Sequence, residues 1–257
     1  MSDLERIQFV LLGIQDLIDN LGSKEIAVYQ SDKGTPVTDA DLFINDFLQK
    51  HLPKDDEGWL SEETLDDLVR LEKRKVWIVD PIDGTRGLLY GLPEWVVSIG
   101  LFDNGLLVAA GILNPSTRSL YLGSKDVAPT LNGNPIFLSK CTNLSEATVA
   151  FSRSDLWQGY GHILKNAPFR LVAIGSIAYK LALVASGYVD AAISLSPKNE
   201  WDTAAGVHLI ETLGGSVKDL DACELKFNSQ DTLQNGIIAG TKNIVDQLFS
   251  YIQKIES

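Results

Sequence analysis

Residues 76–85 read Val-Trp-Ile-Val-Asp-Pro-Ile-Asp-Gly-Thr, so that a short apolar run leads directly into two carboxylates and a Gly-Thr step. The apolar run is typical of a buried strand, which would place Asp80 and Asp83 at its end. Carboxylates ligate hard cations through oxygen, and the backbone N–H groups of a Gly-Thr step can bind an anion. An ordinary strand-end turn is the alternative, because Asp, Pro and Gly are also common in turns. This stretch suits a metal site that holds a phosphate.

Two further acidic stretches strengthen this interpretation. Residues 60–64, Leu-Ser-Glu-Glu-Thr, follow a short apolar segment that could bring Glu62 to the same edge of a sheet. Residues 200–206, Glu-Trp-Asp-Thr-Ala-Ala-Gly, open a helix-like stretch with Asp202 at its start. An Asp in that position is also a common helix cap, which is the alternative role for Asp202. The three acidic stretches together favour a metal site over three unrelated turns and caps.

These stretches resemble the signatures of the inositol monophosphatase superfamily of magnesium-dependent, lithium-sensitive phosphomonoesterases. The resemblance extends from about residue 30 to about residue 240. Its motifs are Pro36–Asp41, Ser61–Glu63, Trp77–Thr85 and Trp201–Gly206, followed by Gly214-Gly215. It implies an α/β (α+β) fold of the inositol monophosphatase and fructose-1,6-bisphosphatase type, a layered α-β-α-β-α sandwich.

The resemblance also implies a set of metal ligands. One Mg²⁺ would be held by Glu62, Asp80 and the backbone carbonyl of Ile82, and a second by Asp80, Asp83 and Asp202. Glu62 could also help to bind a weaker third ion, while the adjacent Glu63 stays open as a substitute for it. All of these ligands are hard oxygens, which favours Mg²⁺ or Mn²⁺ over Zn²⁺. Li⁺ is expected to inhibit by occupying the second position.

Catalytic roles follow from the same resemblance. Thr85 would position the attacking water through its hydroxyl, with support from Asp41, and Glu62 could also orient this water. The N–H groups of Gly84 and Thr85 would receive the phosphate. Asp41 has a structural alternative, because Thr38 and Asp41 have the form of a helix capping box. Bound metal ions would activate water and neutralise charge on the leaving side of the ester.

The substrate is indicated by two features. Residues 197–206 and Lys180 resemble the CysQ-type 3'(2'),5'-bisphosphate nucleotidases, which implies hydrolysis of adenosine 3',5'-bisphosphate to AMP and phosphate. Lys180 would pair with the phosphate that does not react; the alternative is a solvated lysine on a helix. Arg86 is a second candidate for this role, with a surface salt bridge as its alternative. Ser176 is one position out of register with the nucleotidase pattern.

Two other functions stay open. The same metal site would serve an inositol-1-phosphate phosphatase or a broad sugar-phosphate phosphatase. A regulatory or binding protein with incidental phosphatase activity is the third hypothesis, against which the intact carboxylate set and the lack of a basic stripe speak. Gln30 lies where many relatives have a lysine near the metal, and Lys33 could supply that charge instead.

Composition limits the cellular role. The chain has 257 residues, 45% of them hydrophobic, and a net charge of −12, which argues against binding nucleic acid through its phosphates. Its two cysteines lack metal-type spacing, and no targeting segment or membrane span is visible. We expect a cytoplasmic protein that binds a small phosphorylated molecule, with no membrane partner and with a homodimer as a possibility.

The pattern of apolar residues gives the order of the elements. Helices are expected over residues 4–21, ending at Gly22, and from Thr38 to just before Pro53. A β meander is expected from Trp95 to Leu122, with turns at Asn104-Gly105, at residues 114–116 and later at Asn132-Gly133. Strands at 148–151, 171–174 and 189–194 then alternate with helices at 176–186, 202–213 and 241–254. Two halves, 1–140 and 141–257, would form one compact unit with a soft boundary, the first carrying most metal ligands and the second closing the site.

Overall fold

The computed structural model describes residues 1–21, 28–30 and 36–256 of the chain. Its helices are α1 (Asp3–Leu21), α2 (Asp39–His51), α3 (Thr85–Leu89), α4 (Arg153–Trp157), α5 (Gly161–Leu164), α6 (Ile177–Ala185), α7 (Glu200–Thr212) and α8 (Lys242–Glu256). Short 3₁₀ turns form at η1 (Val69–Glu72) and η2 (Leu144–Glu146). The expected helix stop at Gly22 and the position of Lys33 lie outside the described residues.

Two sheets form the framework. The larger has seven strands in chain order, namely β3 (Gly58–Ser61), β4 (Lys75–Asp83), β5 (Val96–Asp103), β6 (Leu106–Asn114), β7 (Ser119–Ser124), β8 (Val127–Leu131) and β9 (Asn134–Pro135). The smaller has five, in the order β11 (Arg170–Ile174), β10 (Thr148–Ser152), β12 (Ala191–Ser194), β16 (Ile237–Gly240) and β14 (Ser216–Lys218). Short antiparallel pairs join β1 (Val28–Gln30) to β2 (Pro36–Thr38), and β13 (Lys198–Asn199) to β15 (Leu233–Gln234).

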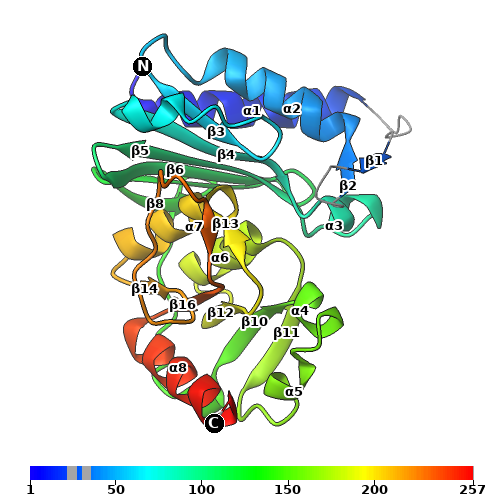
Figure 1. The fold of residues 1–257 in the computed structure, drawn as a ribbon, viewed down its shortest axis with the longest axis vertical. Helices are drawn as coiled ribbons and strands as arrows, with labels where there is room; N and C mark the ends of the chain where they lie inside the picture. Colours follow the sequence, from blue (N-terminus) through cyan, green and yellow to red (C-terminus); the bar gives the residue numbers. More distant parts are fainter. Residues whose placement is uncertain (22–27, 31–35, 257) are drawn as a thin grey trace.

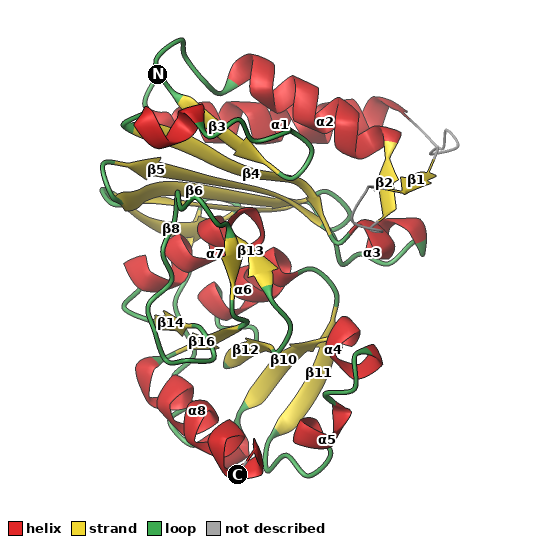
Figure 2. Ribbon diagram, in the orientation of Figure 1, coloured by secondary structure: helices red, strands yellow, loops and turns green. Residues whose placement is uncertain are grey.

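The elements stack in five layers, which confirms the expected α-β-α-β-α sandwich (Figures 1 and 2). Helices α1 and α2 cover one face of the large sheet, while α6 and α7 lie between the two sheets. Helix α8 covers the far side of the small sheet. A division into two halves near residue 140 stays a prediction.

The large sheet contains the expected meander. Its hairpin turns at Asn104-Gly105 and Asn132-Gly133 both have positive φ at each residue, as type I′ turns require. Strand β3 runs parallel to β4, so the C-terminal ends of both strands meet at one edge. The pairing of β4 with β5 shifts register between Asp80 and Asp83, where Pro81 has no N–H to donate. The shift interrupts the ladder at the acidic motif.

The small sheet and its helices agree with the expected βα alternation, with one correction. Strand β10 is parallel to β11 and β12, whereas β16 is antiparallel to β12 and to β14. Helix α7 begins at Glu200 and not at Asp202, because Asn199 is its N-cap and Asp202 lies at the third helical position.

Close packing places α7 against α6 in its own layer and against the large sheet. A Cβ at Gly206 would lie 2.3 Å from the Cβ of Leu181 on α6. A Cβ at Gly100 on β5 would lie 2.9 Å from that of Ala204 on α7. Only glycine permits these approaches. They hold the first turn of α7, and with it Asp202, beside the end of β4.

Candidate active site

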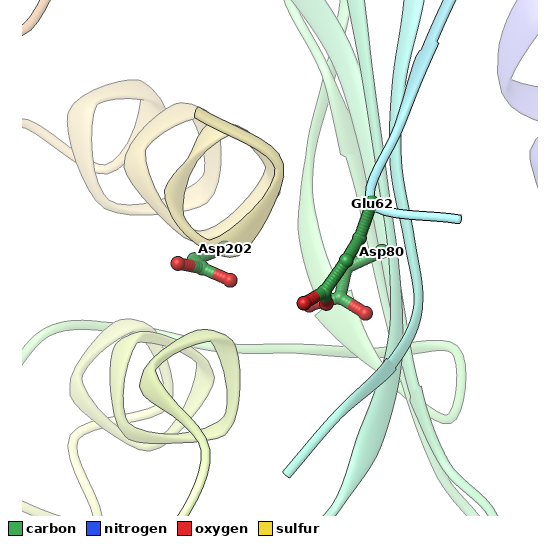
Figure 3. Close-up of side chains that lie close together, drawn as sticks. All are labelled: Glu62, Asp80 and Asp202. Atoms are coloured by element: carbon green, nitrogen blue, oxygen red, sulfur yellow. The ribbon is translucent and has the colours of Figure 1, made fainter. Parts of the chain in front are cut away.

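Three carboxylates from distant parts of the chain converge at the edge of the large sheet. One ligand oxygen from each of Glu62, Asp80 and Asp202 lies within 4.8 Å of the others. Glu62 follows the end of β3, Asp80 belongs to β4, and Asp202 faces them from the first turn of α7 (Figure 3). The adjacent Glu63 is not a member of this cluster as far as the described residues show.

The cluster is electrostatically costly without a cation. Burial, and then the charge of Asp202, raise the pKa of Glu62 to about 8. Burial, and then the charge of Asp83, raise the pKa of Asp202 to about 7. The pKa of Asp80 is also raised, mainly by burial and then by Glu62. Carboxylates that are buried together disfavour their charged forms unless an opposite charge binds between them.

The free oxygen of Asp80 fits a metal ligand. Its Oδ1 accepts the backbone N–H of Ile82 at 2.9 Å. Its Oδ2 is buried and has no hydrogen-bond donor within the described part of the chain. An unsatisfied buried oxygen of this kind calls for an explanation, and a bound ion supplies one. The all-oxygen donor set suits Mg²⁺ or Mn²⁺.

Asp83 makes a different set of contacts. Its Oδ2 accepts the Ser176 hydroxyl at 2.7 Å and the Ala178 N–H at 2.6 Å. Both donors lie at the start of α6, so Asp83 joins the end of β4 to the layer between the sheets. The structure does not bring Asp83 into the three-carboxylate cluster. Its place in a second metal site therefore stays a prediction.

Asp41 connects the start of α2 with the Gly-Thr turn. Its Oδ1 accepts the Thr85 hydroxyl at 3.3 Å, and the same hydroxyl lies 3.1 Å from the carbonyl of Ile82. Its Oδ2 accepts the N–H of Thr38 at 2.8 Å, which completes the capping box. The capping box and the contact between Asp41 and Thr85 are both present, while the catalytic role of Asp41 stays a prediction. Burial raises its pKa.

Gly84 has a backbone that other residues would not tolerate. Its φ is +100°, and a Cβ there would lie 2.6 Å from the carbonyl oxygen of Glu94. Gly84 immediately precedes α3, and both Gly84 and Thr85 line the pocket beside the cluster. Their backbone therefore lies where the sequence predicts that a phosphate binds.

The pocket combines the acidic cluster with positive charge. It has a volume of about 320 Å³, and its lining includes four cationic side chains, Arg86, Arg153, Lys180 and Lys198. Arg86 is exposed at its rim. Because the whole chain carries a net charge of −12, this concentration of cations is a local feature of the pocket.

Lys180 is buried, which contradicts the structural alternative for this residue. A solvated lysine on a helix was the structural alternative for this residue, but its side chain is buried, with 1% of it exposed. Its Nζ donates to the carbonyl of Ser176 at 3.1 Å and to that of Ile174 at 3.3 Å. Burial lowers its pKa to about 8. The helix places this lysine inward because α6 is covered on both sides by sheets.

Several pocket residues were missed by sequence reasoning. Arg153 forms an ion pair with Glu94, whose Oε2 accepts the Gly175 N–H at 2.7 Å. These contacts tie the segment before β5 to the start of α4 and to the turn before α6. Lys198 also lines the pocket. Its position four residues before Asp202 was a signal available in the sequence.

Buried polar groups hold the cluster in place from behind. The Ser61 hydroxyl donates to Oδ1 of Asn45 on α2 at 2.7 Å, and it accepts the N–H of Glu63 at 3.3 Å. This contact fixes the turn that carries Glu62.

A second buried network supports the first turn of α7. Glu200 accepts the N–H groups of Asn228 at 2.6 Å and Ser229 at 2.9 Å. Arg70 donates to the side chain of Asn228 at 2.7 Å and to the carbonyl of Ser229 at 2.8 Å. The loop at Asn228 and Ser229 therefore joins Arg70, in the segment after Glu62, to Glu200 at the start of α7.

Two expectations concern other regions of the chain. Gln30 lies in β1, but its side chain is outside the described part of the structure. No helix among the described residues is both long and apolar enough to cross a membrane.

Comparison with known proteins agrees with this geometry. The model of the inositol monophosphatase family matches residues 8–257. An inositol-1-monophosphatase of Mesorhizobium japonicum is 33% identical over 186 residues, which cover 69% of this chain and 67% of the relative. A 3'(2'),5'-bisphosphate nucleotidase CysQ of Haemophilus influenzae is 30% identical over 227 residues, which cover 82% of each chain.

A solved structure confirms the fold over nearly the whole length. A crystal structure described as an IMPase/NADP phosphatase complexed with Mg²⁺ and phosphate superimposes with a TM-score of 0.81. The match covers 97% of this chain and 96% of the other, at 21% identity. The chain belongs to the inositol monophosphatase family and is a metal-dependent hydrolase of phosphate monoesters.

Proposed function

We propose that the protein is a Mg²⁺-dependent 3'(2'),5'-bisphosphate nucleotidase that converts adenosine 3',5'-bisphosphate to AMP and phosphate. The observation that carries this proposal is the charge of the pocket, where cationic side chains accompany the carboxylate cluster. A substrate with one reacting phosphate needs the metal site alone. A substrate with a second phosphate also needs positive charge beyond that site, because an anionic group that loses water requires compensation.

The metal ligands in this proposal are those implied by the sequence. Two or three Mg²⁺ ions, for which Mn²⁺ could substitute, would be held by Glu62, Asp80, the carbonyl of Ile82, Asp83 and Asp202. The bound ions would supply activation of water and neutralisation of charge on the departing oxygen. The proximity of Glu62, Asp80 and Asp202 and the unpaired oxygen of Asp80 support this assignment. Inhibition by Li⁺ is part of the proposal.

Side chains of the protein would orient the attacking water. In this arrangement the Thr85 hydroxyl, which lies 3.3 Å from Oδ1 of Asp41 and 3.1 Å from the Ile82 carbonyl, would donate its hydrogen bond to Asp41 and direct its lone pairs away from that carboxylate. A water that donates to this hydroxyl would keep its own lone pair free for phosphorus. Glu62 could also accept a proton from the water. The N–H groups of Gly84 and Thr85 would hold an oxygen of the reacting phosphate.

The remaining phosphate would lie toward α6 and α3. Lys180 is buried at the pocket wall, so that its charge acts in a region of low dielectric. Arg86 at the rim could reach the same group from the solvent side. A cytoplasmic location and a homodimer stay predictions.

Phosphate release in the presence of Mg²⁺ tests the proposal. Adenosine 3',5'-bisphosphate and inositol 1-phosphate are compared side by side at equal concentrations, with the Asp80→Asn variant as the control for contaminating phosphatases. We expect a higher kcat/KM for the nucleotide. A much higher kcat/KM for inositol 1-phosphate would overturn the nucleotidase assignment, while the family and the metal site would be unaffected.

An inositol or broad sugar-phosphate phosphatase is the second candidate. The relative from Mesorhizobium japonicum favours it. Inositol 1-phosphate has hydroxyls in place of a second phosphate. Removal of the Lys180 charge should therefore change the kcat/KM for its hydrolysis little. Lys180→Met keeps the aliphatic stem and therefore separates the two candidates with less loss of packing than Lys180→Ala. A purely regulatory role would be supported if Asp80→Asn kept the cellular function of the protein.

A further inference from the structure

We propose that Lys198 binds the second anionic group of the substrate and that Ser196 and Asp155 hold it in position for this. The inference deepens the proposed function and rests on it, since a substrate with a single phosphate would leave Lys198 without a partner. It assigns a specificity role to a residue outside the motifs that mark the metal site.

Lys198 has hydrogen bonds but no counter-ion. Its Nζ donates to the Ser196 hydroxyl at 2.7 Å and lies 3.1 Å from the carbonyl of Pro197 and 3.4 Å from that of Ser196. All three acceptors are neutral. Within the described ranges, no carboxylate forms an ion pair with this ammonium, which lines the pocket. Its positive charge is therefore available to an anionic ligand.

A buried carboxylate fixes the orientation of Ser196. Asp155 on α4 is fully buried, and its Oδ1 accepts the Ser196 hydroxyl at 2.8 Å. Its Oδ2 accepts the N–H of Leu195 at 3.0 Å. A hydroxyl has one proton, and here it is directed to Asp155, so that a lone pair of Ser196 faces Lys198. The chain from Asp155 through Ser196 thus positions the Lys198 ammonium before any ligand binds.

A second ammonium acts on the same pocket. Lys180 bonds only to backbone carbonyls within the described residues. Burial lowers its pKa to about 8; the charge of Asp83 opposes this shift, and the charge of Lys198 adds to it. An anionic ligand in the pocket would favour the charged form of both ammonium groups. A phosphate or sulfate group of the substrate, separate from the group that is cleaved, has this chemistry, because it carries up to two negative charges and several acceptor oxygens.

A second explanation is that Lys198 only balances the acidic cluster. Its charge also lowers the pKa of Asp83 and of Asp202, although burial raises the pKa of both. In that case its removal would change the requirement for Mg²⁺ and the hydrolysis of every substrate to the same extent. In our proposal its removal changes the discrimination between substrates.

The experiment measures this discrimination with a matched pair of substrates at saturating Mg²⁺. Adenosine 3',5'-bisphosphate and adenosine 3'-monophosphate differ only in the second phosphate. The ratio of their kcat/KM values should fall about tenfold or more in Lys198→Met, because a charge-assisted hydrogen bond to a partly buried group is lost. Lys125→Met, which removes an exposed lysine outside the pocket, is the control and should keep the ratio.

Further variants test the positioning chain. Ser196→Ala should lower the same ratio by less than Lys198→Met does, because the ammonium keeps its carbonyl partners, and Lys198→Arg should retain part of the ratio because the charge is preserved. As a readout without turnover, calorimetric binding of the product AMP should weaken in Lys198→Met, whereas binding of adenosine should not.

The outcomes separate this inference from the proposed function. An unchanged ratio in Lys198→Met, or equal losses on both substrates, would overturn the role of Lys198 even if the protein is a nucleotidase. If neither nucleotide is hydrolysed, the proposed function fails, and the ratio is measured with glucose 1,6-bisphosphate and glucose 1-phosphate instead. If Lys198→Met lowers the ratio of the kcat/KM values for these two sugar phosphates, the role of Lys198 in binding a second anionic group is supported. If the ratio is unchanged, that role is overturned.

Discussion

Asp41 accepts a hydrogen bond from the Thr85 hydroxyl at 3.3 Å, although the two residues are 44 positions apart in the sequence. The contact joins the first turn of α2, on the outer layer, to the turn after β4. The other oxygen of Asp41 bonds to Thr38 and caps α2. One buried carboxylate therefore ties the hydroxyl that we assign to water positioning to the start of a long helix, which keeps that hydroxyl in one place.

Removal of the charge of Asp41 should lower the rate without loss of metal. Asn keeps one side-chain oxygen that can accept the Thr38 N–H, so Asp41→Asn should preserve α2 but present an amide where Thr85 now meets a carboxylate. We expect kcat to fall about 10- to 100-fold while the Mg²⁺ concentration for half-maximal activity changes little. Steady-state kinetics over a Mg²⁺ titration measures both quantities. Asp39→Asn changes an exposed acid on the same turn and serves as the control. An equal fall of kcat in Asp39→Asn, or a higher Mg²⁺ concentration for half-maximal activity in Asp41→Asn, would contradict the role that we assign to Asp41.

Metal binding should appear as thermal stabilisation that depends on Asp80. Without Mg²⁺ the wild type contains buried carboxylates whose charged forms are unfavourable. At a Mg²⁺ concentration about 100 times the Kd, binding should stabilise the native state by about 2.7 kcal/mol, and Tm should rise by several degrees. Asp80→Asn should have a similar or higher Tm without Mg²⁺ but respond little when Mg²⁺ is added. Differential scanning fluorimetry measures this, with the exposed Asp126→Asn as a control that should respond like the wild type. Equal Mg²⁺ responses of Asp80→Asn and the wild type would show that the ion binds elsewhere.

His208 should make the protein less stable as the pH falls below 6.5. Its side chain is 5% exposed on α7, and burial lowers its pKa from 6.5 to about 4. The unfolded chain therefore binds a proton between pH 6.5 and 4 that the native state does not bind, so that the free energy of unfolding falls by about 3 kcal/mol over this range from His208 alone.

The comparison of urea unfolding curves at several pH values isolates this contribution. His208→Gln has no ionisable side chain at this position, so its stability should fall less than that of the wild type between pH 6.5 and 4. His51→Gln replaces an exposed histidine and should leave the pH dependence nearly unchanged. Buried carboxylates with raised pKa values act in the opposite direction, but they are the same in all three proteins. Parallel curves for wild type and His208→Gln would refute the prediction.

The Arg70 network should matter more for stability than an exposed ion pair. Arg70 is almost fully buried and also pairs with Asp66 at 2.8 Å. Arg70→Met would leave the acceptors of Asn228 and Ser229 unpaired, and the free energy of unfolding should fall by about 3 kcal/mol. Arg74→Met is the matched control, because Arg74 pairs with Asp103 while 76% of its side chain is exposed, and its loss should cost less than about 1 kcal/mol. Similar losses in both variants would contradict a structural role for the buried network.

The sequence by itself determined the local features of this protein. The capping box at Thr38, the Asn-Gly hairpin turns and the apolar run before Asp80 are signals between residues close in the chain, and the structure has each of them. The layered fold was implied by the family resemblance that the ordered motifs carry. Local hydrogen bonding and side-chain periodicity explain why these features are readable from a few residues at a time.

Contacts between distant residues were decided only by the tertiary structure. The meeting of Asp202 with Glu62 and Asp80 requires α7 to pack closely on the large sheet at Gly100 and on α6 at Gly206. The burial of Lys180, the bond from Ser176 to Asp83 and the orientation of Lys198 likewise depend on the layer between the two sheets. On an isolated helix, the side chain of Lys180 would be exposed to solvent. It is buried here because sheets cover α6 on both sides, and that enclosure exists only after the whole chain has folded.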